Sequence, residues 1–135
     1  MTVKLDLLTP GIEVALVTTR LDEMTAFYEG FLGLQPQGEV EFPGGSQRRY
    51  AVGNSVVKLV SYDIPPEPAA PGGGPRTGIG YFTIGVKNLR ALAQQISESP
   101  YELLEPVTEF APVPGMGWLF VADPDGNRLE FFGTL

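Results

Sequence analysis

The amino-acid sequence predicts an α+β fold of two successive βαβββ modules. Two observations carry this prediction. First, strand-like and helix-like segments follow one another in the same order before and after a stretch rich in proline and glycine. Second, the two halves align without gaps at two places: Glu13 corresponds to Tyr81 (81 − 13 = 68), and Lys58 corresponds to Glu130 (130 − 58 = 72). A loop can absorb the difference between the two offsets, so the chain is interpreted as an internal repeat.

The first module is predicted to begin after a short lead-in that ends at Pro10. Residues 11–19 are apolar and β-branched, which favours a strand. A helix is expected next, with Thr19 as its N-cap, Gly33 as its stop, and an apolar face made of Leu21, Met24, Tyr28, Phe31 and Leu32. Three further strands are expected at 34–42, 46–53 and 55–62, separated by Pro43-Gly44-Gly45 and by the tight-turn pair Gly53-Asn54.

The second module repeats this order after a linker. The linker, 64–77, is too rich in proline and glycine for a helix or an inner strand, so modules 1–63 and 78–135 are expected to form a single domain, 1–135. Asn88 can cap a helix that carries Leu89, Leu92, Ala93 and Ile96. Strands are expected at 78–86, 101–110, 117–124 and 127–133, with Asp125-Gly126 as a hairpin turn.

Composition excludes several classes of protein. The chain of 135 residues is 43% hydrophobic and can build a core, and it contains no cysteine and no histidine. Disulfides, thiol nucleophiles, serine–histidine catalysis and histidine-based metal sites are thereby excluded. The formal net charge of −7 disfavours nucleic acid and anionic membranes as partners and suits a small neutral or cationic organic molecule. Neither a membrane span nor a signal peptide is evident, so a cytoplasmic location is expected.

Three charged residues occupy unusual places in the pattern. Glu13, Lys58 and Glu130 each stand within a predicted strand between apolar neighbours. A charge in such a place is costly unless it lines a polar cavity or meets a partner. The alternation of side chains along a strand therefore marks these three residues as a candidate site.

Two segments resemble the vicinal oxygen chelate superfamily, which includes glyoxalase I, bleomycin resistance proteins and extradiol dioxygenases. They are GIEVALVTTRLDEMTAFYEGFLGL near the start and FVADPDGNRLEFF near the end, and the similarity covers nearly the whole chain in the right order. The resemblance implies that the eight strands of the two modules form a half-open barrel around a cavity. It also implies that a twofold partner covers the strand edges.

The resemblance further implies four metal-ligand positions, one on the first and one on the last strand of each module. They correspond to Glu13, Lys58, Tyr81 and Glu130, of which only Glu130 is the residue type that the family prefers. An ammonium group cannot coordinate a metal, so Lys58 departs from the pattern. We therefore expect no metal and no cofactor.

Several functions remain open on this evidence. The first is a metal-independent small-molecule binding protein, for drug sequestration or as a biosynthetic accessory. The second is a metal-free isomerase, epimerase or lyase with Glu13, Lys58 and Glu130 as catalytic residues, in which Lys58 polarises a ligand oxygen and a carboxylate moves a proton. A metal-dependent glyoxalase or dioxygenase would need a cation held by Glu13, Glu130 and water, which is a weaker ligand set. The charged residues could also form a self-satisfied network that only supports the fold.

Two groups of apolar residues complete the predictions. Five aromatic residues could form a wall for a flat ligand or could belong to the core: Tyr50, Tyr62, Tyr81, Trp118 and Phe132. An apolar, proline-broken stretch at 110–116 predicts a homodimer, because it would be an unusual exposed patch on so acidic a chain.

Overall fold

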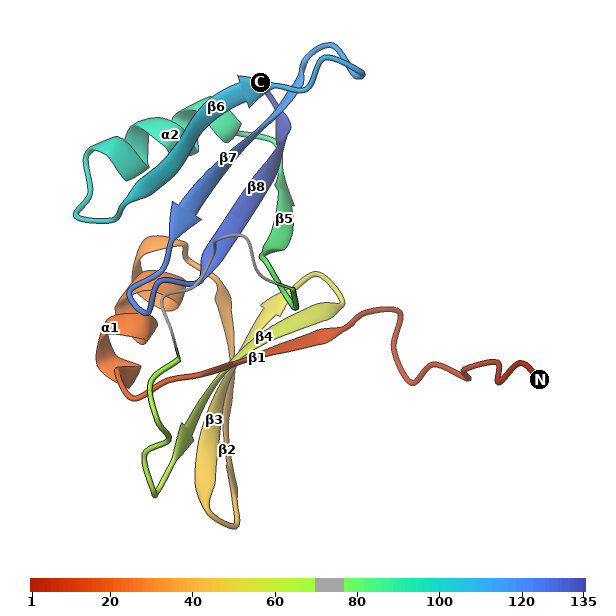
Figure 1. The fold of residues 1–135 in the computed structure, drawn as a ribbon, viewed down its shortest axis with the longest axis vertical. Coiled ribbons are helices and arrows are strands. Elements are labelled where there is room, and N and C mark those ends of the chain that lie inside the picture. Colours follow the sequence, from red (N-terminus) through yellow and green to blue (C-terminus); the bar gives the residue numbers. More distant parts are fainter. Residues whose placement is uncertain (70–76) are drawn as a thin grey trace. The chain divides into compact units, whose positions relative to one another are not determined.

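The computed structural model describes residues 1–69 and 77–135, and the chain divides into two compact units. The units are Met1–Glu67 and Pro68–Leu135, so the division falls inside the predicted linker. Residues 70–76 of that linker lie outside the described residues, and its described parts carry no helix or strand. Each unit contains one four-stranded mixed sheet with a helix, and neither sheet closes on itself (Figure 1). The fold is therefore α+β, with two βαβββ modules as the sequence predicts.

The first unit has the strand order β1-β4-β3-β2. Strand β1 runs parallel to β4, and the remaining neighbours are antiparallel. The predicted strands are found within a few residues of their expected limits. The elements are β1 (Glu13–Val17), α1 (Leu21–Thr25), η1 (Ala26–Phe31), β2 (Gln35–Phe42), β3 (Gly45–Val52) and β4 (Ser55–Tyr62).

The helix of the first unit departs from the prediction in two ways. Its first α-helical residue is Leu21, and the N-cap prediction for Thr19 is wrong: Arg20 holds the cap position without a side-chain cap, while Thr18 Oγ1 accepts the Arg20 N–H at 2.8 Å. From Ala26 onward the helix is of the π type. Because hydrogen bonds in a π-turn span five residues, its inward face is displaced, and Phe27 is fully buried although the periodicity did not select it.

The helix of the first unit packs against one face of its sheet. This face contributes Leu59 and Tyr50, which are at most 1% exposed, and α1 contacts β4. Arg48 reaches Thr25 of the helix from the same side, with 2.9 Å between Nη1 and Oγ1. Side chains alternate along a strand, so the residues between these, Arg49 on β3 and Lys58 on β4, lie on the face away from the helix.

The second unit repeats the arrangement with the strand order β5-β8-β7-β6. Leu89, Leu92 and Ile96 are the buried residues of its helix, as predicted, and Leu129 and Leu119 are the fully buried residues of the sheet. Asn88 holds the N-cap position without a side-chain hydrogen bond, and the first strand begins at residue 82 instead of 78. The elements are β5 (Phe82–Val86), α2 (Leu89–Ser97), β6 (Leu103–Glu109), β7 (Met116–Ala122) and β8 (Arg128–Thr134).

The strand registers confirm the internal repeat. In the first unit Ala15 of β1 stands beside Lys58 of β4, and in the second unit Thr83 of β5 stands beside Glu130 of β8. The corresponding differences are 83 − 15 = 68 and 130 − 58 = 72, the two offsets found in the sequence. Equivalent side chains of the two units therefore occupy the same positions in their sheets.

A side-chain-supported turn leads into the last strand. Asp123 Oδ1 accepts the backbone N–H groups of Asp125 and Asn127, each at 2.9 Å, and Gly126 has a φ of 85°. A positive φ is favourable for glycine, so the predicted turn role of the DPDG segment is confirmed.

No helix in the described residues has the length and the apolar character that a membrane crossing requires.

Candidate functional site

Three charged side chains meet on the helix-free face of the first sheet. Glu13 begins β1, Arg49 lies on β3 and Lys58 lies on β4 between them. The register aligns Lys58 with Ala15 on one side and with Arg49 on the other. Side chains on adjacent strands that point to the same face are near neighbours, so the three charged groups come into reach of one another.

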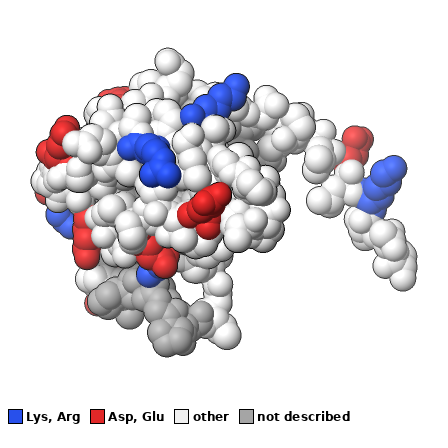
Figure 2. Space-filling model, turned by 90° about the horizontal axis from the view of Figure 1, so that it is seen from above, with Lys and Arg blue, Asp and Glu red and all other residues white. Residues whose placement is uncertain are grey.

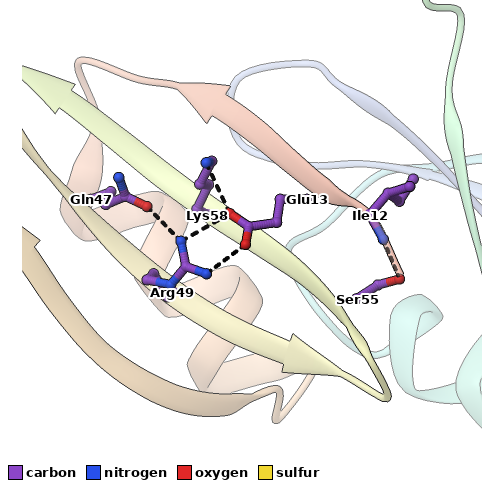
Figure 3. Close-up of polar contacts among 6 residues, drawn as sticks. All are labelled: Ile12, Glu13, Gln47, Arg49, Ser55 and Lys58. Carbon is purple, nitrogen blue, oxygen red and sulfur yellow. Dashed lines mark hydrogen bonds and ion pairs between the residues drawn. The ribbon is translucent and has the colours of Figure 1, made fainter. Parts of the chain in front are cut away.

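The distances show that Glu13 is the shared acceptor of this charged cluster (Glu13, Arg49 and Lys58). Arg49 Nη1 and Nη2 donate to Glu13 Oε1 and Oε2 at 3.0 and 2.8 Å, a two-point contact between a guanidinium and a carboxylate. Lys58 Nζ donates to Glu13 Oε1 at 3.0 Å. Arg49 Nη1 also donates to Gln47 Oε1 at 2.8 Å, which fixes the guanidinium from the side (Figure 3).

These contacts change the ionisation of the cluster. Hydrogen bonds from Arg49, followed by those from Lys58, lower the pKa of Glu13 from 4.5 to about 2. The hydrogen bond to Glu13 raises the pKa of Arg49 above its ordinary value. At neutral pH the carboxylate is therefore ionised and firmly bound to its two cationic partners.

The cluster is partly withdrawn from water. The side chains of Arg49 and Lys58 are 22% and 24% exposed, whereas that of Glu13 is 42% exposed. Val56 and Val60, two residues on either side of Lys58 along β4, are buried. The cations therefore stand in a partly apolar setting, where electrostatic interactions are stronger than in open solvent.

Sequence reasoning found two members of this cluster and missed its third. Glu13 and Lys58 were selected as mid-strand charges, and the structure brings them together. Arg49 was considered as a gripping residue only among other surface arginines. The alternation on 46–53 places Gln47 and Arg49 on one face, which was an available signal. The cross-strand register that aligns Arg49 with Lys58 depends on hydrogen bonds between strands and cannot be obtained from this alternation.

Glu130, the third predicted catalytic residue, lies in the second unit. It stands on β8, and the Thr83 hydroxyl donates to Glu130 Oε1 at 2.7 Å across the parallel pair β5–β8. Glu130 is half-buried and Thr83 is exposed. The carboxylate therefore has a neutral hydrogen-bond partner in its own sheet.

Aromatic rings gather on the same helix-free face of the second sheet. Tyr81 meets Phe120 edge to face with 4.9 Å between ring centroids, and the Arg128 guanidinium lies 5.1 Å from the Phe120 centroid. Phe110 contacts Trp118 and Phe132 at 6.3 and 5.5 Å between centroids. Three of the five predicted ligand-binding aromatics, Tyr81, Trp118 and Phe132, therefore share this face.

The other two predicted aromatics lie in the first unit and differ from each other. Tyr62 is 43% exposed and its ring meets Phe42 at 6.1 Å. Tyr50 is 1% exposed, on the helix side of the sheet, where burial raises the pKa of its hydroxyl. It lines a hollow of about 240 Å³, together with residues that include Glu29, Glu39 and Arg48. Tyr50 is thus part of the core beneath the helix, which was the other interpretation open for it.

The repeat places different chemistry at equivalent positions of the two sheets. Glu13 is equivalent to Tyr81 through the offset of 68. Arg49 is equivalent to Phe120, because Arg49 stands beside Lys58 and Phe120 stands beside Glu130. The first pair is an ion pair and the second is an edge-to-face aromatic pair. The same contact between two strands is therefore ionic in one unit and aromatic in the other.

The residues at the implied metal positions do not fit a metal ion. Lys58 has no lone pair to offer and donates to Glu13, whose two oxygens already accept hydrogen bonds from cations. Tyr81 packs on Phe120. Among the residues that the structure describes, no three His, Cys, Asp or Glu side chains are grouped so that they could hold a metal.

Two βαβββ modules, each with one helix on one face of its sheet and candidate site residues on the other, define a class of paired-module α+β protein. The family model confirms this class. The chain belongs to the Glyoxalase/Bleomycin resistance protein/Dioxygenase superfamily, whose model matches residues 12–131.

Solved structures of this superfamily share the fold. A glyoxalase family protein from Bacillus cereus is 18% identical, with a TM-score of 0.81 over 100% of this chain and 99% of that chain. The YycE protein of Bacillus subtilis, described as of unknown function and as a candidate glyoxalase/fosfomycin resistance protein, is 24% identical, with a TM-score of 0.66 over 91% and 88%. The trypanothione-dependent glyoxalase I of Leishmania major is 18% identical, with a TM-score of 0.68 over 90% and 84%. No curated protein is similar enough in sequence to count as a match.

Proposed function

We propose that this chain is a small-molecule binding protein of the glyoxalase/bleomycin-resistance type that works without a metal ion. Its role would be to sequester a drug or to assist a biosynthetic step, and the proposal includes a cytoplasmic location and a twofold homodimer. The observation that carries it is the contact of Lys58 and Arg49 with Glu13. These contacts supply positive charge from the protein's own side chains at a position where the family resemblance implies a metal ligand.

The donor chemistry supports this proposal over a metal enzyme. A cation entering beside Glu13 would meet Lys58 and Arg49 within hydrogen-bond distance of the same carboxylate. Binding would therefore require two ion pairs to be exchanged for one metal–oxygen contact. The chain has no histidine or cysteine that could contribute a stronger ligand.

Isothermal titration with nickel, zinc, iron and manganese salts tests metal independence. We expect no stoichiometric binding to the full chain. One tight cation per chain would overturn the proposal if Glu13→Gln removed that binding while Glu39→Gln, at an exposed glutamate on β2, preserved it. Native mass spectrometry of the purified protein is expected to show a small organic molecule retained by the chain.

The second candidate function is the metal-free isomerase, epimerase or lyase. The hydrogen bond of Glu130 to a neutral hydroxyl favours it, because this carboxylate is not bound to a cation in its own sheet. Glu13, with a pKa of about 2, is a weak base at neutral pH. Within this candidate, Glu130 therefore takes the proton and Lys58 polarises an oxygen of the substrate.

Glu130→Gln tests this candidate. We expect it to abolish turnover while the midpoint of thermal unfolding stays close to that of the wild type. Glu105→Gln, at another carboxylate of the second sheet, serves as the control and should leave turnover intact. Undiminished turnover in Glu130→Gln would reject the assignment.

A further inference from the structure

We propose that the charged cluster (Glu13, Arg49 and Lys58) binds an anionic oxygen group, such as a carboxylate, of the small molecule. This inference rests on the proposed function and narrows its ligand class. It departs from the neutral or cationic ligand that the charge of the whole chain suggested.

The charge balance of the cluster is the first argument. Two cations share one carboxylate, which leaves one net positive charge at this face of a chain whose formal net charge is −7. Among the described residues, neither Arg49 nor Lys58 forms an ion pair with any other carboxylate. A single anionic group would bring the cluster to neutrality.

The unused hydrogen-bond donors are the second argument. A guanidinium has five N–H donors, and Arg49 uses three of them on Glu13 and Gln47. An ammonium has three donors, and Lys58 uses one on Glu13. Two N–H groups of Arg49 and two of Lys58 are thus available for oxygen atoms of a ligand.

The position of the donors is the third argument. Arg49 and Lys58 are cross-strand neighbours on one face, so one small anion can contact both side chains. Both are about three-quarters buried, and the valines on either side of Lys58 are buried as well. Charge-assisted hydrogen bonds are strongest in such partly dehydrated places.

Figure 3 shows how the cluster is built to hold a second acceptor. Glu13 approaches Arg49 and Lys58 from β1, while Gln47 contacts Arg49 from the opposite side (Figure 3). The arginine is therefore held in place before any ligand arrives. A preorganised cation loses little conformational freedom on binding, which favours affinity.

A titration with benzoate and its neutral analogue benzamide tests the inference. We would record 1H–15N spectra of the full chain at constant ionic strength, including the Arg49 Nε–H signal. Benzoate is expected to give saturable shifts in that signal and in the backbone signals of residues 47–49 and 56–60, and benzamide is expected to give none. Shifts of equal size with both compounds would overturn the inference.

Substitutions give the test a directional signature. Arg49→Gln and Lys58→Gln should each weaken benzoate binding by about tenfold, because each removes one charge-assisted donor. Glu13→Gln should strengthen it by about fivefold, because the cluster then carries two net positive charges. A role that is only structural predicts weaker binding for all three, and that outcome would contradict the inference.

Arg48→Gln is the matched control, since Arg48 neighbours Arg49 on β3 but points to the helix side, where it contacts Thr25. We expect benzoate binding to be unchanged in it. Loss of binding in this variant alone would place benzoate in the hollow beside Tyr50 and overturn the inference. Thermal unfolding of every variant shows whether the fold is retained.

The retained molecule separates this inference from the proposed function. If mass spectrometry finds a bound organic molecule that Arg49→Gln and Lys58→Gln keep at wild-type occupancy, the anion inference fails while small-molecule binding stands. If no molecule is retained and benzoate still binds as described, the inference holds and the retention expected from the proposed function fails.

Discussion

Glu13 holds the charged cluster together, because both cations of the cluster donate to the same carboxylate. An acceptor shared in this way is sensitive to its own protonation: a neutral carboxyl group keeps the geometry but loses the charge that attracts Arg49 and Lys58. The pH dependence of stability therefore reports on this single residue.

The first prediction concerns that pH dependence. The pKa of Glu13 lies at about 2 in the folded chain and near 4.5 in the unfolded chain, so its contribution to stability is complete above about pH 4.5 and is lost as the pH falls toward 2. Wild type should exceed Glu13→Gln in its thermal midpoint at pH 6, and the difference should narrow below pH 4.5. Calorimetry across this range, with Glu39→Gln as the control, checks the expectation. A difference that is independent of pH would contradict it.

Residue-level prediction from sequence succeeded where alternation alone was sufficient. Glu13 and Lys58 are charges between apolar neighbours, and their contact follows from strands that pack side by side. Arg49 required knowledge of which residue stands opposite which. That alignment is a property of hydrogen bonds between strands, so the composition of one strand does not contain it.

The second prediction lies at the scale of a strand pair. Gly133 of β8 packs against β5 so closely that an added Cβ would overlap the backbone carbonyl of Val86. Gly133→Ala should therefore separate the parallel pair and destabilise the second unit by about 1–3 kcal/mol or more. Chemical denaturation measures the loss.

A neighbouring glycine supplies the control. A Cβ on Gly85 of β5 would lie 3.8 Å from the Phe132 carbonyl oxygen, which is an ordinary contact. Gly85→Ala is expected to leave the free energy of unfolding nearly unchanged. Equal losses in the two variants would show that close approach is not the cause.

The third prediction concerns helix packing in the second unit. Leu129 of β8 is fully buried, as is Leu89 of α2. Leu129→Ala should lower the free energy of unfolding by about 2–5 kcal/mol, because it removes apolar contacts and leaves a cavity. Thr134→Ala, at an exposed position of the same strand, should have little effect in the same denaturation measurement.

The helices show why element limits were harder to predict than element types. Periodicity placed the helix of the first unit correctly but could not indicate its π-turn, since the same apolar residues serve an α-helix. The π-turn is set by how Phe27 and Tyr28, both fully buried, fit their surroundings. In the same way, residues 78–81 resemble a strand in composition, yet β5 begins only at Phe82, where pairing with Leu129 starts.

The fourth prediction concerns the assembly of the whole molecule. We expect a homodimer, because the loop before β7 exposes Val113 by 47% in an apolar stretch whose neighbour Phe110 is tied to Trp118 and Phe132. Light scattering at micromolar concentration should report twice the chain mass of 14.6 kDa. A mass near 14.6 kDa would refute the dimer.

A pair of matched substitutions locates the expected interface. Val113→Asp should dissociate the dimer, because a buried unpaired charge is costly. Val40→Asp, at a valine of the first unit that is 46% exposed, should leave the mass unchanged. Dissociation by the second substitution alone would move the interface to the first unit.

Charge is less informative about the whole molecule than it was for the cluster. On the face drawn in Figure 2, acidic and basic side chains are interspersed and form no large patch of one sign (Figure 2). The net charge of −7 is an average, and it did not predict a site with an excess of positive charge. By contrast, the two-module order was readable from the sequence because the repeat offsets survive in the strand registers.

The shared register of the two sheets also bears on how such a protein changes over generations. Backbone ladders determine which Cβ atoms stand together, whatever those atoms carry, so descendants of one duplicated module inherit a common grid of positions. At one pair of grid positions this lineage now holds Glu13 with Arg49 in the first copy and Tyr81 with Phe120 in the second. A few point mutations at such positions can exchange ionic for aromatic recognition without altering the topology.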